Sequence, residues 1–233
     1  MKKIKLFQDG PTLKEIEDLK DKVDGYTFNP TLFKKLGAKD YINFTRDILT
    51  KTNNKSVSIE VFADTEDECL NQAKIIQQIN EKISVKIPIV YTNGETTINL
   101  ISKLVENDIK LNITAIFTLD QIKYILPKIE RTKTILSVFS GRIFDIGLDA
   151  ENIFKKISDD VHSNSECQLL WASCRMPYDY IMAERSGADI ITMPTDMILK
   201  LEKFGKDPVD FSLETVKMFY DDAKKSNFKI LKS

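Results

Sequence analysis

Lys86 is the residue whose type and position say most about chemistry in this chain. It interrupts residues 83–89, where every second residue is Ile or Val. Side chains alternate along a strand, so the apolar set faces one way and Lys86 faces the other, into the fold. A lysine in a low-dielectric pocket has a lowered pKa and can be a neutral amine near pH 7. Such an amine attacks carbonyl groups to form a Schiff base.

Polar residues recur on the same inward side of several other strand-like segments. Parity places Glu60 opposite the apolar residues of 57–61, and the same rule applies to the neighbouring segments. The inward set comprises Asp9, Thr27, Asn29, Glu60, Asn112, Thr114, Ser137, Phe139 and Ser173. Burying so many polar groups costs free energy unless they are paired or used. A functional pocket is one interpretation; a structural network in which Lys86 neutralises Glu60 or Asp9 is the other.

These residue types favour aldol chemistry on a polyhydroxy carbonyl compound. Lys86 would supply the amine, while the carboxylates of Asp9 and Glu60 could move protons to and from hydroxyl groups or a water. Several hydroxyl groups could be bound by Asn29, Asn112, Thr114 and Ser137.

Two arginines follow strand-like segments and suggest a phosphate site. Arg142 comes after the sixth such segment, and Arg175 follows Ser173 after the seventh. Arginine binds phosphate in a bidentate manner, and the Ser173 hydroxyl adds a further donor. Alternatively, each arginine is an ordinary solvated surface residue.

Short apolar segments alternate with segments of helical period. The strand-like segments are residues 4–7, 25–29, 57–63, 83–90, 111–117, 134–139, 168–173 and 188–193. The helical ones are residues 12–20, 39–49, 66–79, 95–106, 119–129, 150–161, 177–186 and 196–204. Strict alternation predicts a parallel sheet, and eight such units fit a (β/α)8 barrel. An open doubly wound sheet is the alternative, but no glycine-rich nucleotide-binding loop follows the first strand.

The barrel is expected to form one domain, residues 1–233, with a helical tail at about 206–233. A C-terminal helix is predicted at about residues 213–224, and Phe211, Leu213, Val216 and Phe219 lie at near-helical spacing. This amphipathic helix would pack either on its own barrel or on a neighbouring subunit.

The composition argues against several other classes of protein. Lys and Arg number 34, and Asp and Glu number 35, a balance that does not suit coating nucleic acid or an anionic membrane. No apolar run approaches the ~20 residues of a membrane helix, and residues 1–11 lack the apolar core of a signal peptide. The three cysteines form no C-x-x-C pair, and the single His162 cannot build a zinc cluster. We expect free thiols in a reducing cytoplasm and no metal site.

Taken in order, these motifs resemble the transaldolase family, including its short branch and the fructose-6-phosphate aldolases. The resemblance runs from Asp9 to about Thr195. The matching pieces are Asp9, Thr27-Phe28-Asn29-Pro30-Thr31, Glu60-Val61, Val85-Lys86-Ile87-Pro88, Asn112-Ile113-Thr114, Ser137-Val138-Phe139-Ser140-Gly141-Arg142-Ile143 and Ala172-Ser173-Cys174-Arg175. Each is weak alone, but all seven occur in order on the expected strands.

The resemblance implies a (β/α)8 barrel without a cofactor that acts on sugar phosphates of carbohydrate metabolism, such as those of the pentose phosphate pathway. Lys86 would be the Schiff-base nucleophile, and Asp9 would act on the C4 hydroxyl during C3–C4 cleavage. Glu60 and Thr114 would hold the water that shuttles protons. The substrate would be bound by Thr27, Asn29, Asn112, Ser137 and Phe139, and its phosphate by Arg142, Ser173 and Arg175.

Within the resemblance, Glu60 and Phe139 favour the transferase branch. Aldolases that release dihydroxyacetone tend to carry Gln and Tyr at these positions, and a Tyr hydroxyl could orient water toward the Schiff base. We therefore expect transfer of dihydroxyacetone from a ketose phosphate to an aldose phosphate. Cleavage of fructose 6-phosphate, a related enzyme of specialised sugar biosynthesis, and a retired sugar-phosphate-binding barrel are the alternatives.

Three residues depart from the family pattern. They are Gly10, Phe28 and Cys174. We expect them to border the pocket and to alter the choice of donor or acceptor sugar. Short-branch relatives are often ring-shaped homo-oligomers whose C-terminal helix crosses to a neighbour, and the amphipathic tail is compatible with that arrangement.

Overall fold

The chain divides into two compact units, Met1–Ile198 and Leu199–Ser233. The structure, a computed structural model, describes residues 3–226 and 228–230. The C-terminal unit includes the region that the sequence predicted as a helical tail, from about residue 206 onward.

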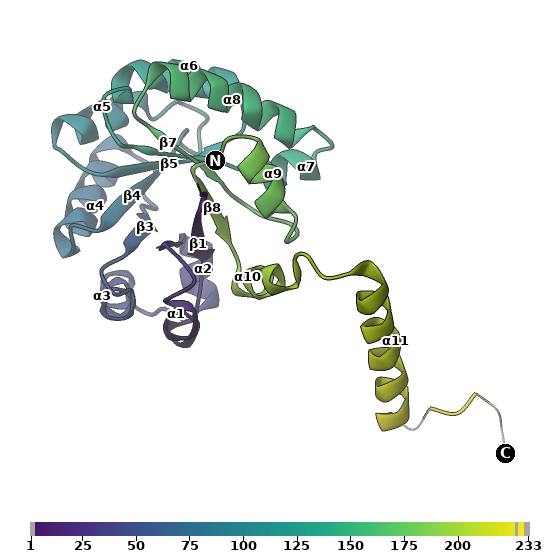
Figure 1. Cartoon of the computed structure of the whole chain (residues 1–233). Coiled ribbons are helices and arrows are strands. Elements are labelled where there is room, and N and C mark those ends of the chain that lie inside the picture. Colours follow the sequence, from purple (N-terminus) through teal and green to yellow (C-terminus); the bar gives the residue numbers. More distant parts are fainter. Residues whose placement is uncertain (1–2, 227, 231–233) are drawn as a thin grey trace. The chain divides into compact units, whose positions relative to one another are not determined.

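The larger unit is the predicted (β/α)8 barrel. Its strands form one closed parallel sheet in chain order, because β1 pairs with both β2 and β8. The strands are β1 Lys5–Asp9, β2 Gly25–Thr27, β3 Ser56–Glu60, β4 Ile83–Pro88, β5 Leu111–Ile116, β6 Ile135–Val138, β7 Gln168–Trp171 and β8 Ile190–Met193. Figure 1 shows helices following the strands around the outside of the barrel.

Helices α4 and α6 have the predicted bounds, whereas two others were not predicted. The barrel unit contains α1 Leu13–Leu19, α2 Pro30–Lys35, α3 Tyr41–Lys51, α4 Glu66–Ile79, α5 Ile98–Glu106, α6 Leu119–Ile129, α7 Ser140–Asp145, α8 Ala150–Asn164 and α9 Asp179–Arg185, and α10 Thr195–Lys200 follows β8. The unpredicted helices, α2 and α7, have six residues each, too few to display a helical repeat. Local capping starts several of the others, as in the box between Thr12 and Glu15 at α1.

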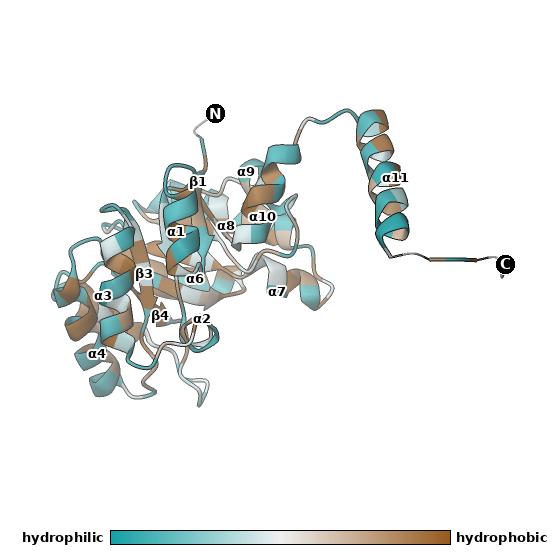
Figure 2. Ribbon diagram, turned by 90° about the horizontal axis from the view of Figure 1, so that it is seen from below, coloured by the Kyte–Doolittle hydropathy of each residue, from teal (hydrophilic) through white to brown (hydrophobic). Residues whose placement is uncertain are grey.

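An apolar cluster fills part of the barrel interior. Phe7, Ile135, Leu170, Ala172 and Ile190 form a buried cluster, against which Phe139 packs. Gly25 makes room for Phe7, since a Cβ at Gly25 would lie 2.6 Å from the Phe7 ring. The hydropathy colouring of Figure 2 shows brown strands within an outer layer of mixed helices.

The strand register determines which inward residues are neighbours. Glu60 pairs with Lys86, and Lys86 pairs with Asn112 on the other side. Asp9 pairs with Thr27. The register between β5 and β6 shifts between Ile113 and Ile116, where Ala115 has a φ of 60°. This irregularity lies directly after Thr114 and near the carboxyl end of β5.

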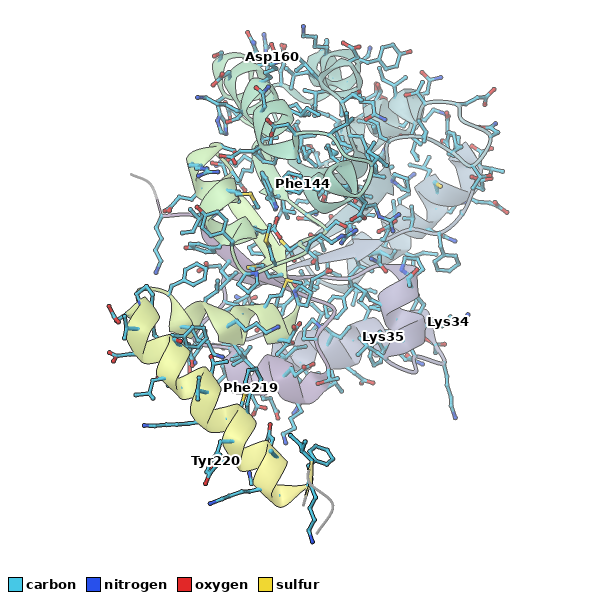
Figure 3. The ribbon with its side chains drawn as sticks, turned by 90° about the vertical axis from the view of Figure 1, so that its right-hand side faces the viewer. Lys34, Lys35, Phe144, Asp160, Phe219 and Tyr220 are labelled. Carbon is cyan, nitrogen blue, oxygen red and sulfur yellow. The ribbon has the colours of Figure 1, made fainter. Side chains whose placement is uncertain are left out.

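The C-terminal unit contains the 3-10 helix η1 Leu201–Lys203 and the helix α11 Pro208–Lys225, which starts before the predicted residue 213. Asp207 caps α11, and Pro208 occupies its first turn. No residue of α11 is buried, and its apolar side chains, among them Phe219 and Tyr220 in Figure 3, are exposed. Both interpretations of this helix, packing on its own barrel or on a neighbour, stay predictions. Among the described residues, no helix is long and apolar enough to cross a membrane.

Candidate active site

A cavity opens at the carboxyl ends of the strands, where parity predicted a ring of polar side chains. It is lined by Asp9, Thr27, Asn29, Lys86, Thr114, Ser137, Phe139, Arg142, Leu170, Ala172, Ser173 and Thr192. Nine of the twelve predicted site residues therefore line one space. The other three, Glu60, Asn112 and Arg175, each contact a residue that lines it.

Lys86 lies at the centre of this arrangement. Its side chain is buried, and its Nζ is 3.0 Å from Glu60 Oε2 and 3.4 Å from the backbone oxygen of Phe28. The ion pair that the sequence left open thus forms with Glu60. It does not remove the functional interpretation, because Lys86 still faces the cavity and has a proton acceptor beside its amine.

Asp9 has an environment suited to proton transfer. Burial of its carboxyl group raises the pKa of Asp9, while a hydrogen bond from Thr27 and the charge of Lys86 lower it in part. The Thr27 hydroxyl donates to Asp9 Oδ1 at 2.6 Å. A carboxyl group with a pKa moved toward neutrality is a better general base than an ordinary aspartate.

Thr192 lines the cavity and was not predicted. Its Oγ1 is 2.6 Å from Thr27 Oγ1. The signal was present, because the parity that assigned the other strands places Thr192 on the same face of β8 as Ile190, a member of the inner cluster.

Asn112 does not line the cavity but holds the hydroxyl group of Ser137, which does. The Ser137 hydroxyl donates to Asn112 Oδ1 at 2.6 Å, and Asn112 Nδ2 donates to Ser58 Oγ at 3.0 Å. All three residues are buried. Of the two residues predicted to bind substrate here, only Ser137 lines the cavity, and Asn112 holds it in place.

The Thr114 hydroxyl is buried and finds no hydrogen-bond partner in the described part of the chain. An unsatisfied buried hydroxyl costs free energy, typically about 1–3 kcal/mol. Because Thr114 lines the cavity, this group is available to hydrogen-bond with whatever enters it.

Asn29 combines a structural and a binding position. Its side-chain oxygen caps α2 by accepting from Leu32 N at 2.9 Å. Its amide nitrogen has two hydrogens to donate, in a side chain that lines the cavity.

None of the three departures from the family pattern lines the cavity, although Phe28 and Cys174 each contact a residue that does. Phe28 is buried and packs edge-on against Phe33, with ring centroids 5.6 Å apart. Gly10 has a φ of 58°. The thiol of Cys174 is buried and donates to the backbone oxygen of Thr192 at 3.2 Å. Their effect on substrate choice would have to be indirect.

The two arginines occupy different positions. Arg142 lines the cavity, and its guanidinium carbon is 5.9 Å from the centre of the Phe139 ring. Arg175 does not line it; its Nε donates to Asp145 Oδ1 at 2.9 Å, and its Nη1 donates to Ser173 O at 2.8 Å. Asp145, on α7, was not predicted, because a surface aspartate has no distinguishing sequence signal.

No group of histidine, cysteine and carboxylate side chains in the described residues could hold a metal ion. The three cysteines are free and buried. The donor set of the cavity is one amine, carboxylates, hydroxyls, an amide and one arginine, which suits a polyhydroxy ligand with an anionic end.

Sequence comparison identifies a family for this arrangement. The family model described as transaldolase/fructose-6-phosphate aldolase matches residues 6–230. A probable transaldolase of Coprothermobacter proteolyticus is 34% identical over 205 residues, covering 86% of this chain and 89% of the relative. A probable transaldolase of Thermoanaerobacter is 29% identical and covers 97% of this chain and 100% of the relative.

Comparison with solved structures supports the fold. N-acetylneuraminate lyase from Mycoplasma synoviae superposes with a TM-score of 0.53 at 12% identity, covering 95% of this chain and 77% of the lyase chain. Thiamine phosphate pyrophosphorylase from Pyrococcus furiosus gives a TM-score of 0.57 at 12% identity, with coverages of 88% and 98%. At these identities the likeness concerns the barrel alone.

Proposed function

The chain belongs to the transaldolase/fructose-6-phosphate aldolase family, and from this we propose that it transfers a dihydroxyacetone unit from a ketose phosphate to an aldose phosphate. The donor would be of the fructose 6-phosphate or sedoheptulose 7-phosphate type, and the transfer would proceed through a Schiff base on Lys86. The names of the relatives, probable transaldolases, support transfer.

One observation carries the proposal: a buried lysine amine lies 3.0 Å from the Glu60 carboxylate in a cavity that Asp9 also lines. Glu60 can accept a proton from the Lys86 ammonium group, and the lone pair of the resulting neutral amine then adds to the C2 carbonyl carbon of the ketose. Glu60 returns its proton to the hydroxyl group of this adduct, and loss of water gives the protonated imine. The unpartnered hydroxyl of Thr114 is suited to binding that water.

Asp9 would serve the carbon–carbon cleavage. As the C3–C4 bond breaks, Asp9 accepts the proton of the C4 hydroxyl, and the bonding electrons move toward the imine nitrogen. The products are an aldehyde and an enamine that stays bound to Lys86. Burial raises the pKa of Asp9, which makes the carboxylate a stronger base for this step.

Arg142 would bind the substrate phosphate, because it is the arginine that lines the cavity. Ser173 lines the cavity beside it, and its Oγ is 3.1 Å from Arg175 Nη1. Arg175 would act mainly by holding Ser173, since Asp145 and Ser173 already accept hydrogen bonds from its guanidinium group.

Phe139 supports transfer over cleavage. Its ring lines the cavity and carries no hydroxyl that could direct water to the intermediate. Slow hydrolysis leaves the enamine time to attack an acceptor aldehyde. Cleavage that releases dihydroxyacetone is the second candidate, and the family description includes it.

Borohydride trapping tests the proposal. The protein is mixed with fructose 6-phosphate, reduced, and analysed by intact mass and peptide mapping. We expect a three-carbon adduct on Lys86, none in Lys86→Met, and an unchanged adduct in Lys123→Met, which alters an exposed lysine on α6.

Product analysis then separates the two reactions. With an aldose phosphate present, transfer yields a new ketose phosphate and little free dihydroxyacetone. A high yield of free dihydroxyacetone without an acceptor would favour cleavage. A folded protein that forms no adduct with any of a panel of ketose phosphates would contradict both.

A further inference from the structure

We propose that Thr192 is a positioning residue for Asp9 and acts on it through the hydroxyl group of Thr27. The inference rests on the proposed function insofar as Asp9 is taken to move the proton of the reaction. Thr192 itself would not exchange a proton with the substrate.

The three side chains come from three adjacent strands. β8, β1 and β2 lie side by side in the barrel, and each contributes one residue to the chain of hydrogen bonds. Thr27 Oγ1 is 2.6 Å from Asp9 Oδ1 and 2.6 Å from Thr192 Oγ1. Thr27 therefore stands between the catalytic carboxyl group and Thr192.

The number of hydrogens on each group sets the direction of the hydrogen bonds from Thr192 through Thr27 to Asp9. Each threonine hydroxyl has one hydrogen, and an ionised carboxylate has none. When Asp9 is ionised, the Thr27 hydrogen points to Asp9, so the hydrogen between the two threonines must belong to Thr192. A hydroxyl that accepts one hydrogen bond donates a stronger one, so Thr192 strengthens the bond that Thr27 makes to Asp9.

The direction of these two hydrogen bonds can also reverse. When Asp9 is protonated, its own hydrogen can point to Thr27, and Thr27 can then donate to Thr192. Both hydrogen bonds therefore survive the transfer of a proton to Asp9. Preorganised dipoles that serve both states lower the reorganisation that accompanies proton transfer.

Thr192 is held firmly enough for this role. It is only 4% exposed. In the strand register it lies beside Phe7, two residues before Asp9 on β1. The buried thiol of Cys174 donates to its backbone oxygen at 3.2 Å. The departure of Cys174 from the family pattern thus affects the backbone that carries this hydroxyl.

Charged and titratable groups on other elements also act on Asp9. Lys86 on β4 favours the ionised form of Asp9, and Glu60 on β3 disfavours it. Cys174, in the segment after β7, has a pKa that burial raises well above the usual value, so its thiol is neutral. Thr192→Val leaves these groups in place, so the substitution tests the hydrogen-bond chain itself.

The test compares Thr192→Val, Thr192→Ser and the control Thr134→Val. Thr134 is also buried, but it precedes β6 at the opposite end of the barrel. The Asp9 carboxyl carbon is followed by 13C NMR across pH without substrate, with Asp9→Asn used for assignment. The pH profiles of kcat and KM are measured in parallel.

We expect Thr192→Val to raise the titration midpoint of Asp9 by about 0.5 pH unit. The acidic limb of the kcat profile should move by the same amount, with kcat lowered up to about threefold on that limb and KM unchanged. Thr192→Ser keeps a hydroxyl and should restore both values, and Thr134→Val should match the wild type.

An unchanged Asp9 midpoint in Thr192→Val would overturn the inference, even where Lys86 is trapped normally. If the midpoint moves but no ketose phosphate is trapped on Lys86, the hydrogen-bond chain stands and the proposed function fails. Should Thr192→Val not fold, Thr192→Ala removes the same hydroxyl without adding a methyl group, and the same criterion applies to it.

Discussion

A Cβ atom on Gly141 would lie 1.6 Å from the backbone oxygen of Ser173. The segments after β6 and β7 therefore approach one another so closely that only glycine fits. Ser173 also has a φ of 65°, in the left-handed region. The two segments carry Arg142 and Ser173, so their approach determines the geometry of the candidate phosphate site.

Gly141→Ala should damage both stability and substrate binding, because the backbone at Ser173 has to move. We expect a loss of at least about 2 kcal/mol in the free energy of unfolding and about a tenfold rise in KM for phosphorylated donors. Urea denaturation and steady-state kinetics measure these effects. Gly37→Ala is the control: Gly37 has a φ of 77°, but a Cβ added to it would meet no atom within 4 Å, so the change should cost about 1 kcal/mol and leave KM unchanged.

Arg142→Gln should raise KM for phosphorylated ketoses about 10- to 100-fold and leave the kinetics of unphosphorylated ketoses unchanged. The same change at Arg175 should have a smaller effect, because Arg175 bonds to Asp145 and Ser173 and does not line the cavity. Arg131→Gln alters an exposed arginine and serves as the control. Equal effects at Arg142 and Arg175 would contradict this division of roles.

Asp9→Asn should lower kcat and raise the free energy of unfolding at neutral pH. Burial raises the pKa of Asp9, so the folded protein holds this proton more tightly than the unfolded chain. Asp9 therefore favours folding at low pH, and that contribution is lost as pH rises through its folded pKa.

At pH 7 we accordingly expect Asp9→Asn to be more stable than the wild type by about 1 kcal/mol, with the difference shrinking under acidic conditions. Its kcat should fall at least about 100-fold. Thermal denaturation across pH checks the first expectation, with Asp47→Asn on the exposed side of α3 as control. If the stability difference between Asp9→Asn and the wild type grew as the pH fell, a raised pKa of Asp9 in the folded protein would be contradicted.

Phe139→Tyr should shift the balance from transfer to cleavage. The new hydroxyl would lie in the cavity and could orient a water toward the Schiff base. We expect the ratio of free dihydroxyacetone to transfer product to rise several-fold, measured by chromatography with and without an acceptor aldose. Phe117→Tyr is a suitable comparison, because Phe117 packs against Phe139 at 6.0 Å but does not line the cavity.

The sequence predicted the closed barrel and most of the cavity lining because both follow from strand periodicity. Lys86 stands out in a run of β-branched residues, and the same parity places Asp9, Thr114 and Ser137 on the inner face of the barrel with it. Thr192 was not predicted, because it is a single hydroxyl residue in an otherwise apolar strand. Applying the parity argument to β8 would have found it.

Other features depend on geometry that sequence does not encode locally. Asp145 pairs with Arg175 from 30 positions away, and nothing in its neighbourhood distinguishes it from other surface aspartates. The departures at Phe28 and Cys174 were expected to border the pocket because they adjoin site residues in sequence. Alternation along the chain instead turns Phe28 toward the helices, where it packs on Phe33.

The cap that Asn29 forms on α2 has a consequence for recognition. Folding of the first turn of α2 fixes the rotamer and amide orientation of Asn29 before any ligand arrives. The loss of side-chain entropy is thus part of folding, and binding need not repeat it. One lone pair of the oxygen is used by the cap, and the amide N–H donors stay available for the oxygen atoms of a sugar.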